Sequence, residues 1–541
     1  MKKLFRCMIA LCLAAALLLT GCGTVDFVGY FSGLAKYFAG FGTVHFSQME
    51  YIRPDMESFR QNVQEVYDRL AENQKATRVM DAVYGVYEDY YLFYTAYALA
   101  NIHYCQDLTD ESWEEEYNLM LTWSVEVDGA MRQLLHTLGN SSIRADLENP
   151  MYFGSGFFDS YSNHDYYDET FLGFLAQEAE LIGQYYALSG EAGELERGSE
   201  TFYTTYGNQM LELYVDLVEV RQQMAQYAGY DSFAQFAYDY YYMRDYTPEQ
   251  AQTLLQDIQS ELVPLYVSVD YDALRSLGLT MCTETDTFDY VRECAGAMDT
   301  TVQEAFNLMD QAGLYDISYN KNKFDASFEI YLIGYAEPFI FLNSTGTVLD
   351  QLTFAHEFGH FCNDYASQGA GASVDVSEVF SQGMEYLSLL YCADTEDLTT
   401  LKMVDSLSVF VEQAAYASFE HQVYALEGND LTAEQVLALF DQVATDFGFH
   451  NWDWDSRDFV RITHFFTNPL YVMSYVVSND AALQIYEKEL ESPGEGQAVY
   501  LRNLDTTQTG FLSFVNYAGL NSPFEPGRVA RLRELFEERV P

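Results

Sequence analysis

Apolar residues recur at spacings of three and four along most of the chain, which is the pattern of amphipathic helices. The pattern is clearest in three stretches, 54–104, 193–229 and 247–269. Thr247 followed by Pro248 marks the start of a helix, with the threonine as N-cap. Only 10 prolines occur in 541 residues, which also favours helices. The sequence therefore predicts a mainly α protein.

One segment, 328–347, departs from the helical pattern. Its sequence, FEIYLIGYAEPFIFLNSTGT, is rich in β-favouring residues and contains a turn around Gly334–Pro338. It predicts a short hairpin or an edge strand directly before the segment TFAHEFGHF. In an edge strand, Phe339, Phe341 and Asn343 would be placed to bind an extended peptide by strand addition.

The first 21 residues have the character of an export signal. Basic residues precede an apolar run, Cys7–Leu19, that is too short to span a bilayer with confidence. The sequence Leu-Thr-Gly-Cys that ends at Cys22 resembles the lipobox of bacterial lipoproteins, in which cleavage leaves the cysteine as a lipid-modified N-terminus. We therefore expect a signal peptide at 1–21, lipidation at Cys22 and a tether at 22–45. An ordinary secretory signal or a membrane helix is the alternative.

If Cys22 is lipidated, the protein is anchored to the membrane through lipid only and does not span it. The expected location is the bacterial cell envelope, on the extracytoplasmic side. The oligomeric state does not follow from the sequence.

Composition argues against several kinds of partner and site. The chain carries 27 Lys and Arg against 82 Asp and Glu, a formal net charge of -55. Nucleic acid is therefore not an expected partner, because its phosphates require basic patches. Solubility of an exposed protein explains this charge, and attraction of cationic substrates is the alternative. The five cysteines after Cys22 are odd in number and lack close paired spacing, which disfavours a disulfide scaffold or a cysteine zinc site.

The segment TFAHEFGHF, 353–361, carries the candidate chemistry. On a helix, His356 and His360 share a face and can direct two imidazole nitrogens at one metal ion. Glu357 is turned by about 100° from His356, which places it beside the metal, where it can take a proton from water. This H-E-x-x-H pattern is a zinc metalloprotease signature. Gly359 would let another helix approach closely. The alternative is an ordinary helix with no metal.

A catalytic zinc usually has three protein ligands and one open position, so a third ligand is required. The metzincin pattern would place it shortly after His360, but Asn363 and Ala366 occupy the required places. A glutamate on a following helix is the other solution. The helical segment VDVSEVFSQGMEYLSLL supplies Glu378, and the glycines of SQGAGAS before it mark a turn.

Two further acidic residues near Glu378 are candidates for support of the ligands. Glu385 lies seven residues after Glu378, on the same side of the predicted helix two turns on. Glu385 and Asp375 could each accept the N–H of a ligand imidazole. The alternative is a solvated acidic face, which is common in so acidic a protein.

These residues resemble a known family. FAHEFGHF followed by DVSEVFSQGMEYL is similar to the thimet oligopeptidase and oligoendopeptidase F family of zinc metallopeptidases, which has H-E-x-G-H and then D-x-x-E-x-x-S-Q-x-x-E. MEYIRPD, EPFIFLNSTGT, HFFTNPLYVMSYVVSNDAAL and FLSFVNYAGLNSPFEP resemble other parts of the family. The resemblance extends from about residue 46 to the C-terminus and is nearer the oligoendopeptidase F branch.

The resemblance implies a mainly α, two-lobed, zincin-like fold with a deep substrate channel and a small β element before the zinc helix. The peptidase domain would occupy 46–541, with the zinc core at about 325–480. The metal would be one zinc ion (Zn2+). The implied roles are metal ligands at His356, His360 and Glu378, a general base at Glu357, and donors to substrate and oxyanion at His464 and at Tyr475 or Tyr471, of which Tyr475 is preferred.

The expected function is zinc-dependent hydrolysis of peptide bonds in short oligopeptides, because the channel of the family excludes folded proteins. The first alternative is a lipoprotein that binds peptides and has lost catalysis. The presence of Glu357 disfavours this alternative, since a binder has no need of a base. The second alternative is a structural envelope protein whose H-E-x-x-H helix binds no metal.

Overall fold

The structure is a computed structural model of the chain, and it describes residues 43–162, 168–192, 199–426, 428–451, 454–506, 508 and 510–540. The predicted signal peptide, Cys22 and the predicted tether up to residue 42 lie outside the described residues. Among the described helices, none has the length and apolar character that a membrane span requires.

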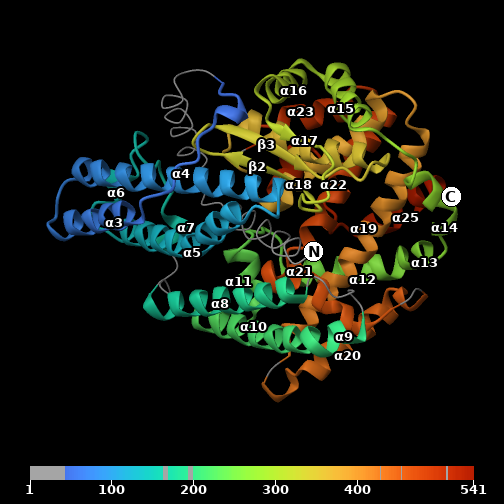
Figure 1. Ribbon diagram of the computed structural model, residues 1–541. Helices are drawn as coiled ribbons and strands as arrows, with labels where there is room; N and C mark the ends of the chain where they lie inside the picture. Colours follow the sequence, from blue (N-terminus) through green and yellow to red (C-terminus); the bar gives the residue numbers. More distant parts are fainter. Residues whose placement is uncertain are drawn as a thin grey trace.

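Helices make up most of the described chain, as the sequence predicts (Figure 1). Those before the sheet are α3 (Met56–Ala71), α4 (Ala76–Gln106), α5 (Glu111–Gly139), α6 (Arg144–Leu147), α7 (Asp159–Ser162), α8 (Glu169–Ala192), α9 (Glu200–Phe202), α10 (Asn208–Tyr227), α11 (Phe233–Tyr240), α12 (Pro248–Glu261), α13 (Val263–Tyr266), α14 (Tyr271–Gly278), α15 (Glu284–Met298) and α16 (Thr300–Ala312).

The helices after the sheet carry the predicted site residues. They are α17 (Leu349–Ser367), α18 (Val374–Tyr391), α19 (Glu396–Val423), α20 (Ala433–Asp446), α21 (Thr463–Thr467), α22 (Met473–Glu491), α23 (Glu495–Asn503), α24 (Phe511–Ala518) and α25 (Arg528–Arg539). Short 3-10 or π turns are η1 (Phe46–Gln48), η2 (Tyr203–Gly207), η3 (Gly428–Asp430), η4 (Phe449–Asn451) and η5 (Ser456–Arg461).

Local sequence accounts for where helices begin. The predicted start at Thr247 is confirmed: its side chain accepts from the backbone N–H of Gln250, and the Gln250 side chain accepts from the backbone N–H of Thr247. This reciprocal arrangement is a capping box, and Pro248 opens α12 after it. The helical pattern predicted over 54–104 is divided in two, because α3 ends at Ala71 and α4 begins at Ala76.

The sheet has three strands in the order β1 (Tyr315–Asp316), β3 (Glu337–Leu342), β2 (Ser327–Leu332). Strands β2 and β3 are antiparallel and form the hairpin that the sequence predicts in 328–347. The two-residue strand β1, which the sequence pattern does not reveal, runs parallel to β3 and pairs at Ile340 and Phe341. Strand β3 is therefore the middle strand of the sheet.

The predicted strand addition at Phe339, Phe341 and Asn343 is therefore not available at Ile340 and Phe341, where β1 already pairs with β3. Both phenylalanine side chains are fully buried, and Phe46 packs on Phe339 with ring centroids 4.3 Å apart. The Asn343 side chain bonds to the backbone of Asn320, accepting from its N–H at 3.0 Å and donating to its carbonyl at 3.2 Å. Because β1 pairs with Ile340 and Phe341, β3 is not an edge strand at these two residues, and peptide binding elsewhere along the segment stays a prediction.

Helix α17 lies against the sheet on one side and against α18 on another, and α22 packs against α18 (Figure 1). Gly359 permits the close approach of α17 and α18, as its position predicts. A Cβ atom at residue 359 would lie 2.4 Å from the carbonyl oxygen of Phe380 and 2.7 Å from Cα of Ser381. Gly359 therefore allows the two helices that carry the predicted metal ligands to pack closely against each other.

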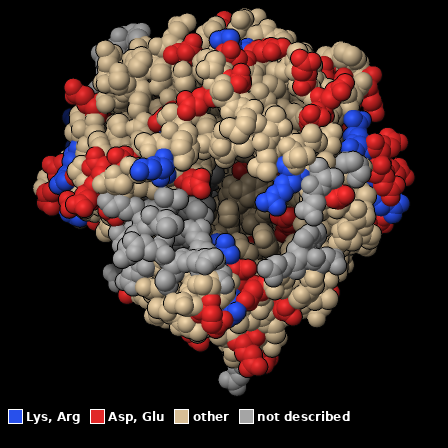
Figure 2. Space-filling view, turned by 45° about the vertical axis from the view of Figure 1, so that its right-hand side comes forward, with Lys and Arg blue, Asp and Glu red and all other residues tan. Residues whose placement is uncertain are grey.

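Helices α3, α4 and α5 form an arm at one end of the molecule, and α8 and α10 lie side by side below it (Figure 1). Figure 2 shows that one face of the molecule is hollowed at its centre. Acidic side chains outnumber basic ones over this face, in keeping with the net charge of -55.

Candidate active site

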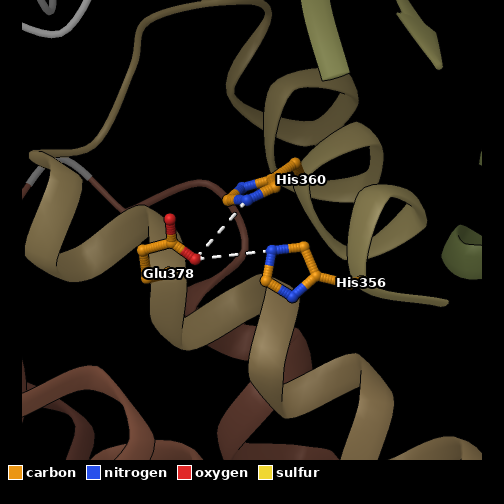
Figure 3. A group of neighbouring side chains, drawn as sticks. All are labelled: His356, His360 and Glu378. Carbon is orange, nitrogen blue, oxygen red and sulfur yellow. Dashed lines mark ion pairs between the residues drawn. The ribbon is translucent and has the colours of Figure 1, made fainter. Parts of the chain in front are cut away.

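Helices α17 and α18 are joined by a short turn that brings the predicted ligands together. Gln368, Gly369 and Gly371 all have positive φ values of 55°, 71° and 64°. Glycine adopts this conformation without steric cost, which explains two glycines in six linking residues. The turn reverses the chain direction, so that Glu378 on α18 faces His356 and His360 on α17 (Figure 3).

The three side chains converge on one point. Oε2 of Glu378 lies 3.5 Å from Nε2 of His356 and 3.7 Å from Nε2 of His360 (Figure 3). One donor atom from each residue lies within 4.8 Å of the other two. Two imidazole nitrogens and one carboxylate oxygen form a donor set that suits zinc. The residues present therefore fit a metal ion.

The second nitrogen of each histidine is also engaged, which fixes the orientation of both rings. Nδ1 of His356 lies 2.8 Å from Oε1 of Glu385, and Nδ1 of His360 lies 3.0 Å from Oγ of Ser377. The other Glu385 oxygen is 2.8 Å from Nζ of Lys402, which is buried. The structure thus brings Glu385 to the place where the sequence predicts it.

The prediction that Asp375 accepts an imidazole N–H requires a correction. The carboxylate of Asp375 accepts from the guanidinium of Arg244 at 3.3–3.4 Å, from the hydroxyl of Tyr246 at 2.9 Å and from that of Ser474. These partners occupy the buried carboxylate on the side of α18 that faces α22. Asp375 therefore stabilises the packing behind Glu378 by these hydrogen bonds instead of orienting a ligand imidazole.

Glu357, the predicted general base, has a largely buried side chain with 5% of its surface exposed. Burial raises its pKa to about 7, and the attraction of His356 and a hydrogen bond from Ser327 oppose that rise. Burial first lowers the pKa of His356, but the hydrogen bond and charge of Glu385 outweigh burial and raise it to about 9. The pKa of His360 shifts the opposite way, because burial and the charge of His356 both lower it.

The predicted donors His464, Tyr471 and Tyr475 form a group of rings beside the ligands. Ring centroids of His464 lie 5.4 Å from Tyr471 and 6.1 Å from Tyr475, and the two tyrosines are 5.3 Å apart. The Tyr471 hydroxyl donates to Oε1 of Glu378 at 3.2 Å. Burial lowers the pKa of His464 to about 4, so the ring is neutral near pH 7. Tyr471, the less favoured of the two tyrosines, makes the direct contact with the ligand group.

Sequence reasoning missed three residues that hold this site: Ser377, Lys402 and Arg244. Ser377 precedes Glu378 directly and has no distinguishing pattern. Lys402 stands between Leu401 and Met403 in a chain with few basic residues, and this apolar setting was its signal. Arg244 is the single cation of the run YDYYYMRDY, and its position among five tyrosines was its signal.

Two histidines one helical turn apart, a carboxylate from a return helix and a glutamate beside the first histidine define a metallohydrolase centre of the H-E-x-x-H class. The chain belongs to peptidase family M3: the Peptidase family M3 model matches residues 199–506, and the Peptidase M3 N-terminal domain model matches residues 46–164. The predicted resemblance is thus confirmed, and the protein is a metal-dependent peptidase by family.

Solved structures share the fold. The chain superposes on PZ peptidase A with TM-score 0.77 at 20% identity, covering 91% of this chain and 99% of the other. A structure assigned as oligoendopeptidase F from Bacillus anthracis str. Ames gives 0.74 at 19%, covering 92% and 98%. Another assigned as oligoendopeptidase F gives 0.76 at 20%, also covering 92% and 98%. No curated protein sequence matches the chain.

Proposed function

We propose that this protein is a zinc-dependent endopeptidase that hydrolyses short peptides, tethered to the cell envelope by a lipid on Cys22. The observation that carries the proposal is the convergence of His356, His360 and Glu378, whose donor atoms lie within 4.8 Å of one another. A buried acid next to the first ligand supports hydrolysis over mere binding. Zinc is the preferred ion because two imidazoles and one carboxylate leave a fourth position open.

A zinc ion held by these three residues would supply a Lewis acid that polarises the peptide carbonyl and acidifies water. Glu357 accepts the proton of the attacking water and passes it to the leaving amine. Burial raises the pKa of Glu357, which makes its carboxylate a stronger base toward the proton of water. Glu385 and Ser377 bond to Nδ1 of His356 and His360. These bonds direct Nε2 of both imidazoles toward the metal position.

Charge that develops on the carbonyl oxygen requires a donor that keeps its proton at neutral pH. A tyrosine hydroxyl meets this need. The contact of Tyr471 with Glu378 supports Tyr471 as the nearer donor, and Tyr475 packs 5.3 Å away, ring to ring. Neutral His464 contributes a donor or an acceptor without adding charge to the site.

The test combines metal analysis with peptide cleavage by the mature protein. We expect about one zinc per chain and cleavage of a peptide library that chelator abolishes. Glu357→Gln should retain zinc while turnover falls by about 10²–10⁴-fold, the usual contribution of a general base. Unchanged low turnover in Glu357→Gln would favour the peptide-binding alternative. Absence of zinc after zinc is supplied would contradict the proposal and favour a structural protein.

The lipid anchor is tested separately, because it rests on the sequence around Cys22 alone. We expect the full chain to partition into the membrane fraction of a bacterial host and to incorporate labelled fatty acid. Cys22→Ser should abolish both, whereas Cys282→Ser should change neither. Membrane partitioning that survives Cys22→Ser would favour an uncleaved membrane helix instead.

A further inference from the structure

The tyrosine-rich segment Tyr238–Tyr246 surrounds a buried cation. The Arg244 side chain has no exposed surface. Its guanidinium carbon lies 4.5 Å from the ring centre of Tyr238, 4.4 Å from Tyr242 and 5.6 Å from Tyr246. Aromatic faces attract a cation at these distances. The tyrosines thus enclose Arg244, and core packing alone does not account for the segment.

Arg244 binds the two segments that carry Glu378 and Tyr471. Its guanidinium donates to the carbonyl of Leu470 at 2.9 Å and to that of Tyr471 at 3.4 Å. The same group bonds to Asp375, which lies three residues before Glu378 on α18. It also donates to Oγ of Ser474 at 2.9 Å, and Ser474 in turn donates to Asp375. One side chain therefore ties the start of α18 to the segment before α22.

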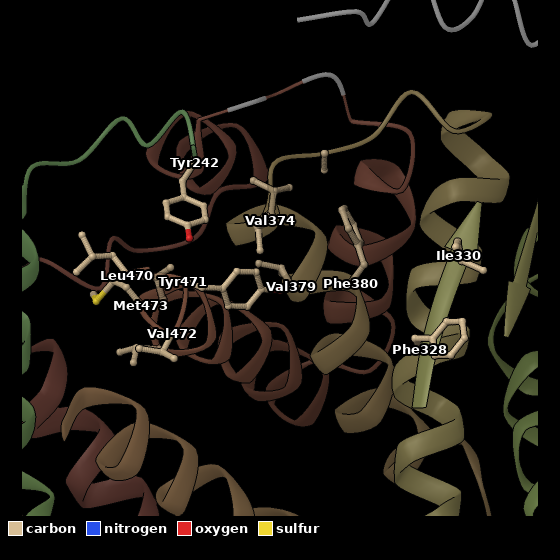
Figure 4. Packing of buried hydrophobic residues seen from close by; sticks show 14 of the residues in the cluster. Tyr242, Phe328, Ile330, Val374, Val379, Phe380, Leu470, Tyr471, Val472 and Met473 are labelled. Atoms are coloured by element: carbon tan, nitrogen blue, oxygen red, sulfur yellow. The ribbon is translucent and has the colours of Figure 1, made fainter. Parts of the chain in front are cut away.

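The segment that Arg244 holds has an unusual backbone. Leu470 has a φ of 64°, a left-handed conformation that costs a branched residue about 1 kcal/mol or more. Its N–H donates to Oε1 of Glu420 at 2.7 Å, while its carbonyl accepts from Arg244. The Tyr242 hydroxyl donates to the carbonyl of Pro469 at 2.7 Å, and Figure 4 shows Tyr242 beside Leu470 and Tyr471. Such a conformation persists only where its surroundings fix it.

We propose that Arg244 is a positioning residue for the metal centre: it fixes the Tyr471 hydroxyl relative to Glu378. This inference rests on the proposed function of Tyr471 and Glu378. Arginine suits the task because its planar fork offers five donors, enough for two carbonyls, a hydroxyl and a carboxylate together. Lysine has one ammonium group and cannot span these partners.

The test compares Arg244→Lys with Tyr471→Phe and with the double variant. In Arg244→Lys we expect about one zinc per chain, KM within about twofold of the parent and a kcat about 10- to 100-fold lower, the range for misplacement by about 1 Å. The double variant should be no slower than Tyr471→Phe, because both changes remove the same contribution. Losses that multiply in the double variant would overturn the proposal.

Arg528→Lys is the matched control. Arg528 is also buried and pairs with Asp480 on α22 at 2.7 Å, in a part of the helix beyond Tyr475. We expect Arg528→Lys to lower the melting temperature without changing kcat. An equal loss of kcat in Arg528→Lys would reduce the role of Arg244 to general stability and overturn the proposal.

A crystal structure of Arg244→Lys gives a readout that does not depend on activity. We expect the Tyr471 hydroxyl to move beyond hydrogen-bond distance of Glu378 while the ligands keep their places. A hydroxyl that stays within about 3.5 Å would overturn the positioning role. A parent protein that cleaves no peptide would instead contradict the proposed function and leave this structural result to decide the inference. If Arg244→Lys does not fold, Ser474→Ala takes its place in the same comparison, because it removes one partner of the arginine. We expect Ser474→Ala to lower kcat less than Arg244→Lys, again without loss of zinc.

Discussion

Oε1 of Glu385 lies 2.8 Å from Nδ1 of His356, behind the nitrogen that faces Glu378. Burial raises the pKa of Glu385, but the charge of Lys402 and the hydrogen bond with His356 lower it below its ordinary value. Glu385 is therefore a stable anion and a strong acceptor. A carboxylate in this place fixes the tautomer and direction of the ligand ring and makes it a better ligand.

Replacing Glu385 should therefore weaken metal binding without abolishing it. We expect Glu385→Gln to reduce zinc affinity about 10- to 100-fold, as for other residues that support a ligand. Glu378→Ala should reduce it much further, because it removes a donor atom. Competition with a chelator measures both. Glu412→Gln is the control, since Glu412 bonds to Tyr266 outside the site and should leave affinity unchanged. Equal affinities in Glu378→Ala and the parent would refute the ligand assignment.

Removing the hydroxyl of Tyr471 and of Tyr475 in turn should show which of the two tyrosines is the oxyanion donor. We expect Tyr471→Phe to lower kcat by about 10²–10³-fold, the usual effect of losing one oxyanion donor, with little change in KM. Tyr475→Phe should lower kcat less, because the Tyr471 hydroxyl contacts Glu378 directly. Steady-state kinetics on a fluorogenic peptide measures both variants. Tyr391→Phe, which loses a bond to Glu489 elsewhere, should match the parent. A larger loss in Tyr475→Phe would assign the role to Tyr475.

The sequence predicts the part of the site that depends on local spacing. His356, His360 and Glu378 belong to two consecutive helices joined by a glycine turn, so helical geometry and loop length suffice to place them. The roles of Asp375 and Phe341 could not be predicted, because their partners are distant in the chain. Arg244 lies 131 residues before Asp375, and β1, which pairs with Phe341 in addition to β2, has only two residues. No periodic pattern records such contacts.

Gly359 should be the least replaceable glycine of the metal-binding helices. In Gly359→Ala the new methyl group would overlap the backbone of α18 at Phe380 and Ser381, so the two helices must separate. We expect a loss of stability of about 1–3 kcal/mol or more, with weaker zinc binding. Thermal unfolding and metal titration measure these effects. Gly183→Ala on α8 is the control: a Cβ there meets nothing within 4 Å, so a helix-stabilising effect of about 0.5–1 kcal/mol is expected. Equal stabilities of the two variants would contradict the close approach.

Glu420, which holds the N–H of Leu470, should make stability depend on pH. Its side chain is fully buried, and burial raises its pKa to about 8, although the Leu470 N–H and the charges of Arg221 and Arg244 oppose the rise. The folded protein therefore keeps a proton on Glu420 that the unfolded chain has released, over the range from about pH 4.5 to about pH 8. The unfolded state binds fewer protons than the folded state in this range, so stability falls as the pH rises. The fall is at most about 1.4 kcal/mol per pH unit for one group.

Glu420→Gln removes the titration while an amide oxygen can still accept from Leu470. We expect the melting temperature of the parent to fall relative to that of Glu420→Gln as the pH rises from about 5 to about 7.5. Both proteins are measured in chelator, because zinc binding has its own pH dependence. Below about pH 4.5 the carboxyl group is protonated in both states, so the difference should become constant. If the melting temperatures of the two proteins change in parallel with pH over the whole range, Glu420 is ionised in the folded protein. Arg221 and Arg244 would then have to balance its charge in full.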